Sequence, residues 1–135
     1  MTQKLDPLSR EALISYRIEK CETALREASL LAENGFYDNA VTRLYYACFY
    51  MASALLIKNE IQTGSHKAVK TMLSLKFVKN GELDSKHIKT YTDLLNGRQL
   101  SDYEDFYRQD EESYTFYAIR PNEFIDSIKN LIYRN

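Results

Sequence analysis

The sequence has 135 residues, about the length of one domain, and its 18 Lys and Arg residues nearly balance its 19 Asp and Glu residues. The resulting net charge of -1 lacks the basic surplus that is typical of nucleic-acid-binding domains, although it is compatible with a local basic patch. The low content of 4 Gly and 2 Pro residues argues against a β architecture rich in loops.

Residues 1–8 form a polar lead that we expect to be flexible, and the first helix follows it. Ser9 can cap this helix because its hydroxyl can accept a hydrogen bond from an unpaired amide of the first turn. Apolar residues over positions 13–31 recur mostly at steps of three and four, which predicts an amphipathic helix. We expect it to end at Asn34 and Gly35, because glycine tolerates the left-handed turn that follows a helix.

The segment from Asp38 to Asn59 is predicted to be a helix that is apolar on most of its circumference. Such a helix lies at the centre of a domain or is shared between subunits, so we expect a homodimer. This helix carries a cluster of four aromatic residues: Tyr45, Tyr46, Phe49 and Tyr50. We interpret the cluster as core and dimer interface, with a stacking platform for a nucleobase as the alternative. Arg43 and Lys58 do not interleave with these rings in the sequence, which disfavours the platform.

A third helix is predicted from Ser65 to Asn80 and Gly81, and a fourth begins at Asp84. Gly97 interrupts the apolar series of the fourth helix at a cost of about 1 kcal/mol relative to alanine. We interpret this glycine as a point where another backbone approaches closely or where the helix bends.

Residues 109–120 are predicted to be an irregular loop. Within this segment, Ser113 to Ile119 has the composition of a strand, but no second strand is predicted that could pair with it. We interpret the segment as an extended loop or a lid. Pro121 then suits the first turn of a last, short helix.

The predicted fold is therefore all-α, an up-and-down antiparallel bundle of four long helices plus a short fifth, in a single domain over residues 1–135. The connections are short, so helices that follow one another are expected to be antiparallel neighbours. The amino-terminus lacks the apolar run of a signal peptide, and no apolar stretch reaches the roughly 20 residues that span a bilayer. We expect a cytoplasmic protein that does not interact with a membrane.

Cys21 and Cys48 are not spaced as a CxxC pair, and two cysteines alone cannot form a structural zinc site. We expect both to be reduced thiols. His87 has polar sequence neighbours and is predicted to be exposed. The two histidines and the scattered acidic residues match no metal-binding motif and no catalytic triad, so we expect no metal and no cofactor.

Ser65, His66 and Lys67 open the third helix, where free backbone amides and the helix dipole attract anions. Lys67 would strengthen the binding of a phosphate at this helix start. The alternative is a serine cap with solvated neighbours, because the glycine-rich loop of dedicated phosphate sites is absent.

Arg98 and Asp102 share one face of the fourth helix. They can form an ion pair between adjacent turns, worth roughly a few tenths of a kcal/mol. Alternatively, the planar guanidinium of Arg98 binds a phosphate, while Asp102 orients the guanidinium and Tyr103 adds a hydroxyl.

Three sequence elements resemble one known family. Residues 37–49 (YDNAVTRLYYACF) resemble the second helix of HEPN domains (higher eukaryotes and prokaryotes nucleotide-binding), in which small residues precede a Tyr-Tyr-Ala element. The similarity continues with SHK at 65–67 and with RQLSDY at 98–103. The elements stand in the family's order, and the resemblance covers about residues 10–133.

The resemblance implies a helical bundle that dimerises. For many small prokaryotic members it also implies a minimal nucleotidyltransferase as the partner in a toxin–antitoxin pair. Several members are metal-independent ribonucleases, whose motif is an arginine, four to six intervening residues and a histidine. Arg98 matches the motif arginine, but the positions where the histidine would stand hold Tyr103, Glu104 and Asp105.

We therefore favour a dimeric interaction module that partners a nucleotidyltransferase and binds a nucleotide or RNA at four candidate residues: Arg98, Asp102, Tyr103 and Lys67. The alternative is a divergent metal-independent ribonuclease that uses Arg98 with Tyr103 or His66. The missing motif histidine weighs against catalysis and leaves enzymatic activity open. A tyrosine with a pKa of about 10 is a poor general base at neutral pH, whereas His66 would have to approach Arg98 in the fold.

Overall fold

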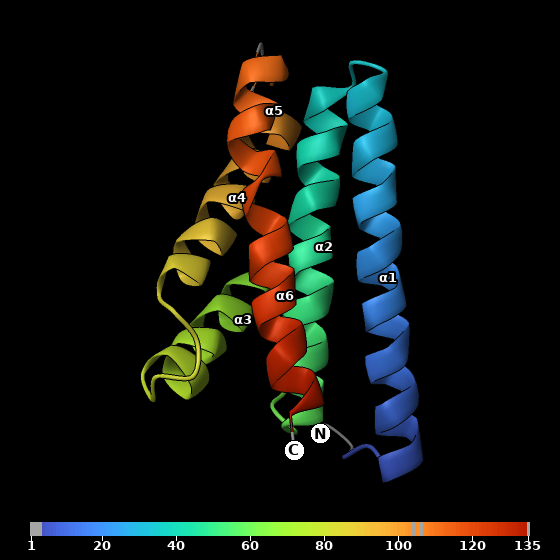
Figure 1. The fold of residues 1–135 in the computed structure, drawn as a ribbon, viewed down its shortest axis with the longest axis vertical. Helices are drawn as coiled ribbons and strands as arrows, with labels where there is room; N and C mark the ends of the chain where they lie inside the picture. Colours follow the sequence, from blue (N-terminus) through green and yellow to red (C-terminus); the bar gives the residue numbers. More distant parts are fainter. Residues whose placement is uncertain (1–3, 104, 106, 135) are drawn as a thin grey trace.

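The computed structural model describes residues 4–103, 105 and 107–134, with only the backbone of residue 103. The described residues form an all-α bundle without strands, as predicted. The two longest helices, α1 (Pro7–Glu33) and α2 (Tyr37–Lys58), run antiparallel along the length of the molecule (Figure 1). The predicted turn between them is confirmed at Gly35, whose φ of 79° lies in the left-handed region.

The first helix begins at Pro7 rather than near Arg10, so the predicted flexible lead over residues 1–8 already contains helix. The cap is Asp6, whose carboxylate accepts a hydrogen bond from the Ser9 amide at 2.8 Å. Pro7 fits the first turn because the amide proton that it lacks would have no partner within the helix there. The prediction that Ser9 is the cap is therefore wrong.

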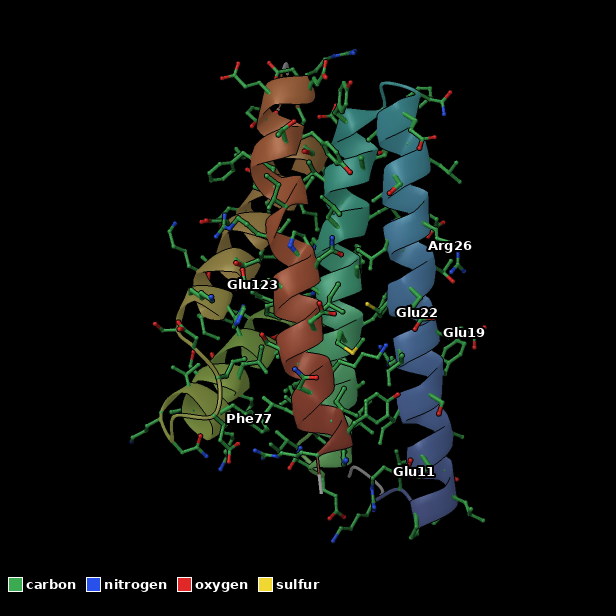
Figure 2. The ribbon with its side chains drawn as sticks, in the orientation of Figure 1. Glu11, Glu19, Glu22, Arg26, Phe77 and Glu123 are labelled. Atoms are coloured by element: carbon green, nitrogen blue, oxygen red, sulfur yellow. The ribbon has the colours of Figure 1, made fainter. Side chains whose placement is uncertain are left out.

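The outer face of α1 is mostly polar, although Leu8, Tyr16 and Leu30 are also exposed on this helix. The charged side chains labelled on α1 in Figure 2 are exposed: Glu11, Glu19, Glu22 and Arg26. The inner face contributes five buried residues: Ile14, Ile18, Cys21, Ala24 and Ala28. This division confirms the amphipathic pattern, because the inner residues are spaced at three and four positions.

The central element of the bundle is α2, which contacts every other α-helix of the described chain. By length and composition, α2 is also the one helix among the described residues that could cross a membrane, but 61% of the relevant window is buried inside the bundle. That burial is the behaviour of a core helix. Cys48 of α2 and Cys21 of α1 are free and buried side chains of the same core.

The third helix, α3 (His66–Leu73), continues into a π-helical turn, η1 (Ser74–Val78). Phe77 of this turn is buried in the core and anchors the segment (Figure 2). The segment ends at Gly81 with a φ of 82°, which confirms the predicted helix end.

The fourth helix, α4 (Lys86–Tyr103), runs antiparallel to α2 (Figure 1). Its predicted start agrees with the structure, because the Asp84 carboxylate accepts a hydrogen bond from the Lys86 amide at 2.9 Å. Gly97 is buried in this helix, and a Cβ atom there would lie 2.9 Å from Cζ of Tyr117. The predicted close approach at this glycine is therefore made by an aromatic side chain and not by a backbone.

The sequence pattern predicts an irregular loop over residues 109–120, but the structure has α5 (Glu111–Ala118) there, so this prediction is wrong. The helix starts with a capping box. The Asp110 carboxylate accepts a hydrogen bond from the Ser113 amide at 2.8 Å, and the Ser113 hydroxyl accepts one from the Asp110 amide at 2.9 Å. These reciprocal bonds satisfy first-turn amides and favour a helix where the composition indicated a strand.

The last helix, α6 (Arg120–Tyr133), follows α5 after the single residue Ile119, and Pro121 lies in its first turn as predicted. Pro121 cannot donate a hydrogen bond to the carbonyl of Tyr117, which separates the two helices. Tyr114 and Tyr117 lie on one face of α5 and pack against the core. Their packing explains why the strand-like segment is helical.

The prediction that His87 is exposed is wrong, because its exposed fraction is 4%. Its ring packs edge-on against Phe124 of α6, with the ring centroids 6.0 Å apart. Burial, followed by the positive charge of Lys86, lowers the pKa of His87 and favours the neutral ring. The polar sequence neighbours of His87 lie on other faces of the helix, so they say little about its own burial.

Candidate functional site

The most connected polar cluster lies where α2, α3 and α4 meet, and Tyr45 of α2 is at its centre. The Tyr45 side chain is fully buried, and its hydroxyl lies 2.7 Å from Nδ1 of His66 and 2.8 Å from the hydroxyl of Tyr91. The Tyr91 hydroxyl, from α4, also donates a hydrogen bond to the backbone carbonyl of His66 at 2.9 Å. Three helices are thus joined by hydrogen bonds through two tyrosines.

His66 is placed in this cluster by the start of α3. Ser65 is extended, with a φ of -156°, and its hydroxyl accepts a hydrogen bond from the Ala68 amide at 3.1 Å, so the predicted serine cap is confirmed. The imidazole packs on the ring of Phe49, with centroids 4.4 Å apart, and lies 5.8 Å from the ring of Tyr46. The ring is therefore held by aromatic contacts as well as by Tyr45.

Arg98 reaches the same aromatic rings from α4. Its guanidinium carbon lies 5.2 Å from the ring centroid of Tyr46 and 5.8 Å from that of Tyr45, both within cation–π range. Arg98 Nε lies 3.4 Å from a carboxylate oxygen of Asp102, which confirms the predicted pair on one helix face. The other oxygen of Asp102 accepts a hydrogen bond from the Thr42 hydroxyl at 3.3 Å, so Asp102 is tied to α2.

The structure thus brings His66 and Arg98 together on shared rings, as the ribonuclease alternative requires. We call the five residues of this cluster the Arg98–His66 site: Tyr45, Tyr46, His66, Arg98 and Asp102. The helix pattern placed Arg98 and Asp102 on one face, but no sequence signal indicated that α3 brings His66 to the same rings. The role of Thr42 was also missed, because its contact with Asp102 joins two helices.

The electrostatics of the site favour a neutral imidazole and protonated tyrosines. Burial lowers the pKa of His66, and the positive charge of Arg98 lowers it further. Burial raises the pKa of Tyr45 and of Tyr91 well above the usual value for tyrosine. At neutral pH the site therefore carries one cation, Arg98, beside an uncharged imidazole that can accept a proton.

The remaining candidate residues lie at the edge of this site or outside the description. Lys67 is exposed in the first turn of α3, next to His66 in the chain. The side chain of Tyr103 lies outside the described residues, so its predicted role stays a prediction. Cations do lie against the aromatic rings of α2, because the guanidinium carbons of Arg43 and Arg98 are 5.0 Å and 5.2 Å from the ring centroid of Tyr46. The spacing of Arg43 in the sequence did not indicate this contact.

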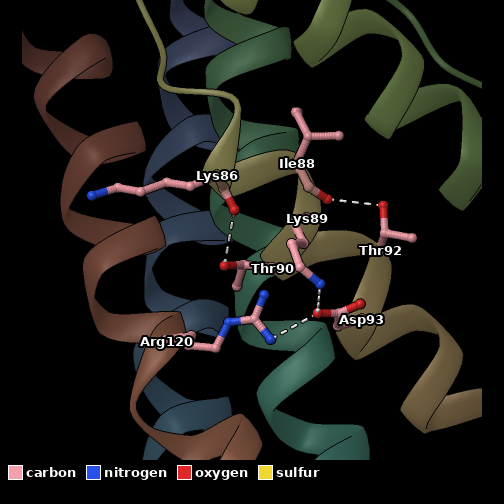
Figure 3. Close-up of polar contacts among 7 residues, drawn as sticks. All are labelled: Lys86, Ile88, Lys89, Thr90, Thr92, Asp93 and Arg120. Atoms are coloured by element: carbon pink, nitrogen blue, oxygen red, sulfur yellow. Dashed lines mark hydrogen bonds and ion pairs between the residues drawn. The ribbon is translucent and has the colours of Figure 1, made fainter.

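A second polar cluster joins α4 to α6 (Figure 3). A carboxylate oxygen of Asp93 accepts hydrogen bonds from Arg120 at 2.8 Å and from Lys89 at 3.1 Å. Burial alone would raise the pKa of Asp93, but these two partners outweigh it and lower the pKa. Thr90 donates a hydrogen bond to the carbonyl of Lys86 at 3.2 Å, within the same helix. The carboxylate is shared between two cations, so this cluster works as a structural tie.

Among the residues that the structure describes, no three His, Cys, Asp or Glu side chains are grouped so that they could hold a metal ion. The polar chemistry of the Arg98–His66 site instead comes from an imidazole, a guanidinium and phenol hydroxyls. Guanidinium groups and neutral imidazoles are suited to phosphate binding and proton transfer, respectively.

Comparison with known proteins gives a consistent set of relatives. A family model described as the HEPN domain matches residues 14–131. A UPF0332 protein of Thermotoga maritima is 31% identical over 123 residues, which cover 91% of this chain and 93% of that protein. Two proteins of Methanocaldococcus jannaschii carry the names "Putative toxin MJ0142" and "Putative toxin MJ0605" and are 32% and 33% identical. The first alignment covers 98% of this chain and 90% of the relative, and the second covers 85% of both.

Proposed function

The chain belongs to the HEPN domain family, and from this premise we propose that it is a toxin-type HEPN protein that binds RNA through a phosphate group at the Arg98–His66 site. The observation that carries the proposal is the position of Arg98, a cation that lies over the aromatic rings of α2 and beside a neutral imidazole. The names of the relatives from Methanocaldococcus jannaschii support the toxin class.

The guanidinium of Arg98 has spare capacity for a phosphate. Within the described chain, its one ion-pair partner is Asp102, through Nε, and this buried Nε makes no hydrogen bond there. A guanidinium carries five N–H donors in a planar fork that matches two phosphate oxygens. Asp102 would hold the fork in place while the outer amino groups bind the phosphate, as the sequence pattern predicts.

The aromatic rings beside Arg98 would accept a base. Tyr46 and Phe49 are half-buried, so each ring keeps part of its surface for contact with a ligand. Bases stack on such rings with little sequence preference, and neighbouring arginines strengthen the contact. Arg43 and Arg98 supply this charge locally, which is compatible with the overall net charge of -1.

The proposal includes a homodimer, a nucleotidyltransferase as the partner and a cytoplasmic location. One chain already buries the core face of α2, but Tyr50 and Ile57, two helical turns apart, are half-buried and would continue the packing across a two-fold axis beside the rings that take the base. A sedimentation experiment at micromolar concentration should show a dimer, and a monomer would remove this part of the proposal.

RNA binding is tested by fluorescence anisotropy with a labelled single-stranded RNA. Arg98→Ala should weaken binding by about 10-fold or more, because hydrogen bonds to charged groups are worth about 1.5–3 kcal/mol. Arg26→Ala is the matched control, since Arg26 is exposed on the outer face of α1. Equal affinity of the two variants would contradict the site. If a mononucleotide displaces the labelled RNA at a concentration similar to that of unlabelled RNA, the ligand is a nucleotide and not an RNA chain.

A second candidate function, a metal-independent ribonuclease, is favoured by the position of His66 beside Arg98. The imidazole would take the proton of a ribose 2′-hydroxyl, and the resulting oxygen would form a bond to the neighbouring phosphorus. The bond from phosphorus to the 5′ oxygen would break, and that oxygen would take a proton from water. The imidazolium would then give its proton to the hydroxide that remains, which restores the neutral ring. Arg98 would stabilise the extra negative charge on the phosphate oxygens during this exchange.

This second candidate predicts a 2′,3′-cyclic phosphate and a 5′-hydroxyl as the ends of the cleaved RNA. His66→Gln should abolish cleavage, and an RNA with deoxyribose at the cleaved position should resist it. His87→Gln serves as the matched histidine control, with its folding checked by circular dichroism. Cleavage by the His66→Gln protein at the rate of the unchanged protein would show that another group, or a contaminant, removes the proton.

A further inference from the structure

The three contacts among His66, Tyr45 and Tyr91 form a closed ring of hydrogen-bonding atoms. Nδ1 of His66 meets the Tyr45 hydroxyl, the Tyr45 hydroxyl meets the Tyr91 hydroxyl, and the Tyr91 hydroxyl returns to the carbonyl of His66. The distances are 2.7 Å, 2.8 Å and 2.9 Å, each within the normal range for a hydrogen bond.

Counting protons gives this ring a single direction. A backbone carbonyl can only accept, so the one hydroxyl proton of Tyr91 is used in the bond to His66. The contact between the hydroxyls then needs the proton of Tyr45, which Tyr45 donates to the oxygen of Tyr91. The oxygen of Tyr45 is left as an acceptor, and the remaining contact requires a proton on Nδ1 of His66.

The opposite direction leaves a contact without a proton. If Tyr45 donated to Nδ1, the two hydroxyl oxygens would face each other at 2.8 Å with no hydrogen between them, or Tyr91 would have to release the carbonyl of His66. Both tyrosine side chains are fully buried, so bulk water does not replace a lost bond there. Burial also raises the pKa of each tyrosine, which keeps both hydroxyl protons in place at neutral pH.

We propose that Tyr45 and Tyr91 are positioning residues that hold His66 in the tautomer with the proton on Nδ1, so that Nε2 is the proton acceptor of the site. In the described part of the chain, no side chain or backbone group forms a hydrogen bond with Nε2. The role of this nitrogen in taking the 2′-hydroxyl proton rests on the proposed ribonuclease function, whereas the tautomer rests on the hydrogen-bond ring alone.

The tautomer is measured directly by long-range ¹H–¹⁵N correlation spectra of the full chain labelled with ¹⁵N. The sequence contains 2 His residues, so the His66→Gln spectrum assigns the signals of both. Nδ1 of His66 should have the shift of a protonated ring nitrogen, and Nε2 that of an unprotonated one. The reverse pattern, or a shift averaged between two tautomers, would overturn the proposal.

The Tyr91→Phe variant provides a second and more specific test of the hydrogen-bond ring. Without the oxygen of residue 91, the Tyr45 proton has no acceptor except Nδ1 of His66, so this variant should invert the tautomer. Thr92→Val is the control on the same helix, because the Thr92 hydroxyl bonds to the Ile88 carbonyl within α4, and it should leave the His66 pattern unchanged. An unchanged tautomer in a folded Tyr91→Phe protein would overturn the ring.

These spectra separate the two proposals. If Nδ1 is protonated and RNA is not cleaved, the hydrogen-bond ring stands and the ribonuclease function fails. If RNA is cleaved by a His66-dependent reaction while Nε2 carries the proton, the function stands and the positioning role of the tyrosines fails. If Tyr91→Phe does not fold, the spectrum of the unchanged protein still decides the tautomer.

Discussion

The two polar clusters of α4 differ in the contacts that their arginine makes. Arg98 and Arg120 are similarly buried, with side chains 17% and 25% exposed, and each is paired with an aspartate of α4. Arg120 of α6 donates a hydrogen bond of 2.8 Å to Asp93 of α4, so this pair joins two helices. Arg98 and Asp102 both belong to α4, their closest atoms are 3.4 Å apart, and the Nε of Arg98 makes no hydrogen bond within the described chain.

This difference separates a structural contact from a binding site. At the α4–α6 contact the carboxylate has two cationic partners, Lys89 and Arg120, and the charges are used to join helices (Figure 3). At the Arg98–His66 site the guanidinium faces aromatic rings and a neutral imidazole, and its buried Nε makes no hydrogen bond within the described chain, so its N–H donors are less fully used. Burial of the arginine is alike in the two regions, and its hydrogen-bond partners decide which region can bind an anion.

The largest expected effect is a loss of folding stability, which would disrupt both polar clusters together. Ala47 is fully buried in α2, which contacts every other α-helix of the described chain. Ala47→Glu would place an unpaired charge there and should lower the free energy of unfolding by about 3 kcal/mol or more. Urea unfolding followed by circular dichroism measures this loss. Leu30→Glu, at a side chain 60% exposed, is the control and should change stability by less than about 0.5 kcal/mol.

Substituting the two arginines one at a time tests whether Arg120 stabilises the fold and Arg98 binds RNA. Arg120→Ala should lower the free energy of unfolding by about 1 kcal/mol, because it removes a bond between two helices, while RNA affinity stays unchanged. Arg98→Ala should instead weaken RNA binding by about 10-fold and lower the free energy of unfolding by less than Arg120→Ala does. Thermal unfolding and RNA anisotropy on the same two proteins give the four values. An RNA affinity that falls more for Arg120→Ala would invert our assignment of the two regions.

A smaller effect concerns Gly97, which lies between the two regions on α4. Gly97→Ala gains up to about 1 kcal/mol of helix propensity but places Cβ against Tyr117, so it should destabilise the protein. In a Tyr117→Ala background the same change should be stabilising, because the contact is gone. Chemical unfolding of the four proteins of this cycle provides the test. A gain of stability in both backgrounds would mean that the tyrosine ring moves aside freely.

The smallest effect is on the pH dependence of stability. Burial and Arg98 hold the pKa of His66 below its usual 6.5, so below that pH the unfolded chain binds more protons than the folded one. Stability should therefore fall as the pH decreases through 6.5 toward the folded-state pKa. His66→Gln should remove part of this fall, and His87→Gln should remove another part, since burial also lowers the pKa of His87. A pH profile that neither substitution changes would contradict the neutral state of both rings.

Much of the fold could be predicted because local sequence decides it. The spacing of apolar residues gave the helices, and Gly35 and Gly81 marked two helix ends through their positive φ. α5 could not be predicted from composition, because the helix depends on the reciprocal bonds of Asp110 and Ser113 and on the packing of aromatic rings. The start of α1 was missed because the Asp6 carboxylate accepts a hydrogen bond from the amide of Ser9, so Ser9 lies inside the first turn and does not cap it.

The candidate site was predicted only in the part that one helix contains. Arg98 and Asp102 are one turn apart, so helix geometry alone pairs them. The position of His66 depends on how α3 packs across α2 and α4, and the bond between the Tyr45 and Tyr91 hydroxyls depends on the same packing. A single sequence carries no periodic signal for contacts between three helices, and so these contacts become visible only in the structure.

The measurement that tests the account most directly is an NMR titration of the ¹⁵N-labelled protein with a short single-stranded RNA. The RNA carries 2′-O-methyl groups, which prevent cleavage. Our account predicts that the side-chain signals of Arg98 and His66 shift as RNA is added, while those of Arg120 and His87 do not. Shifts confined to Arg120 and His87, or the absence of any shift at saturating RNA, would contradict it.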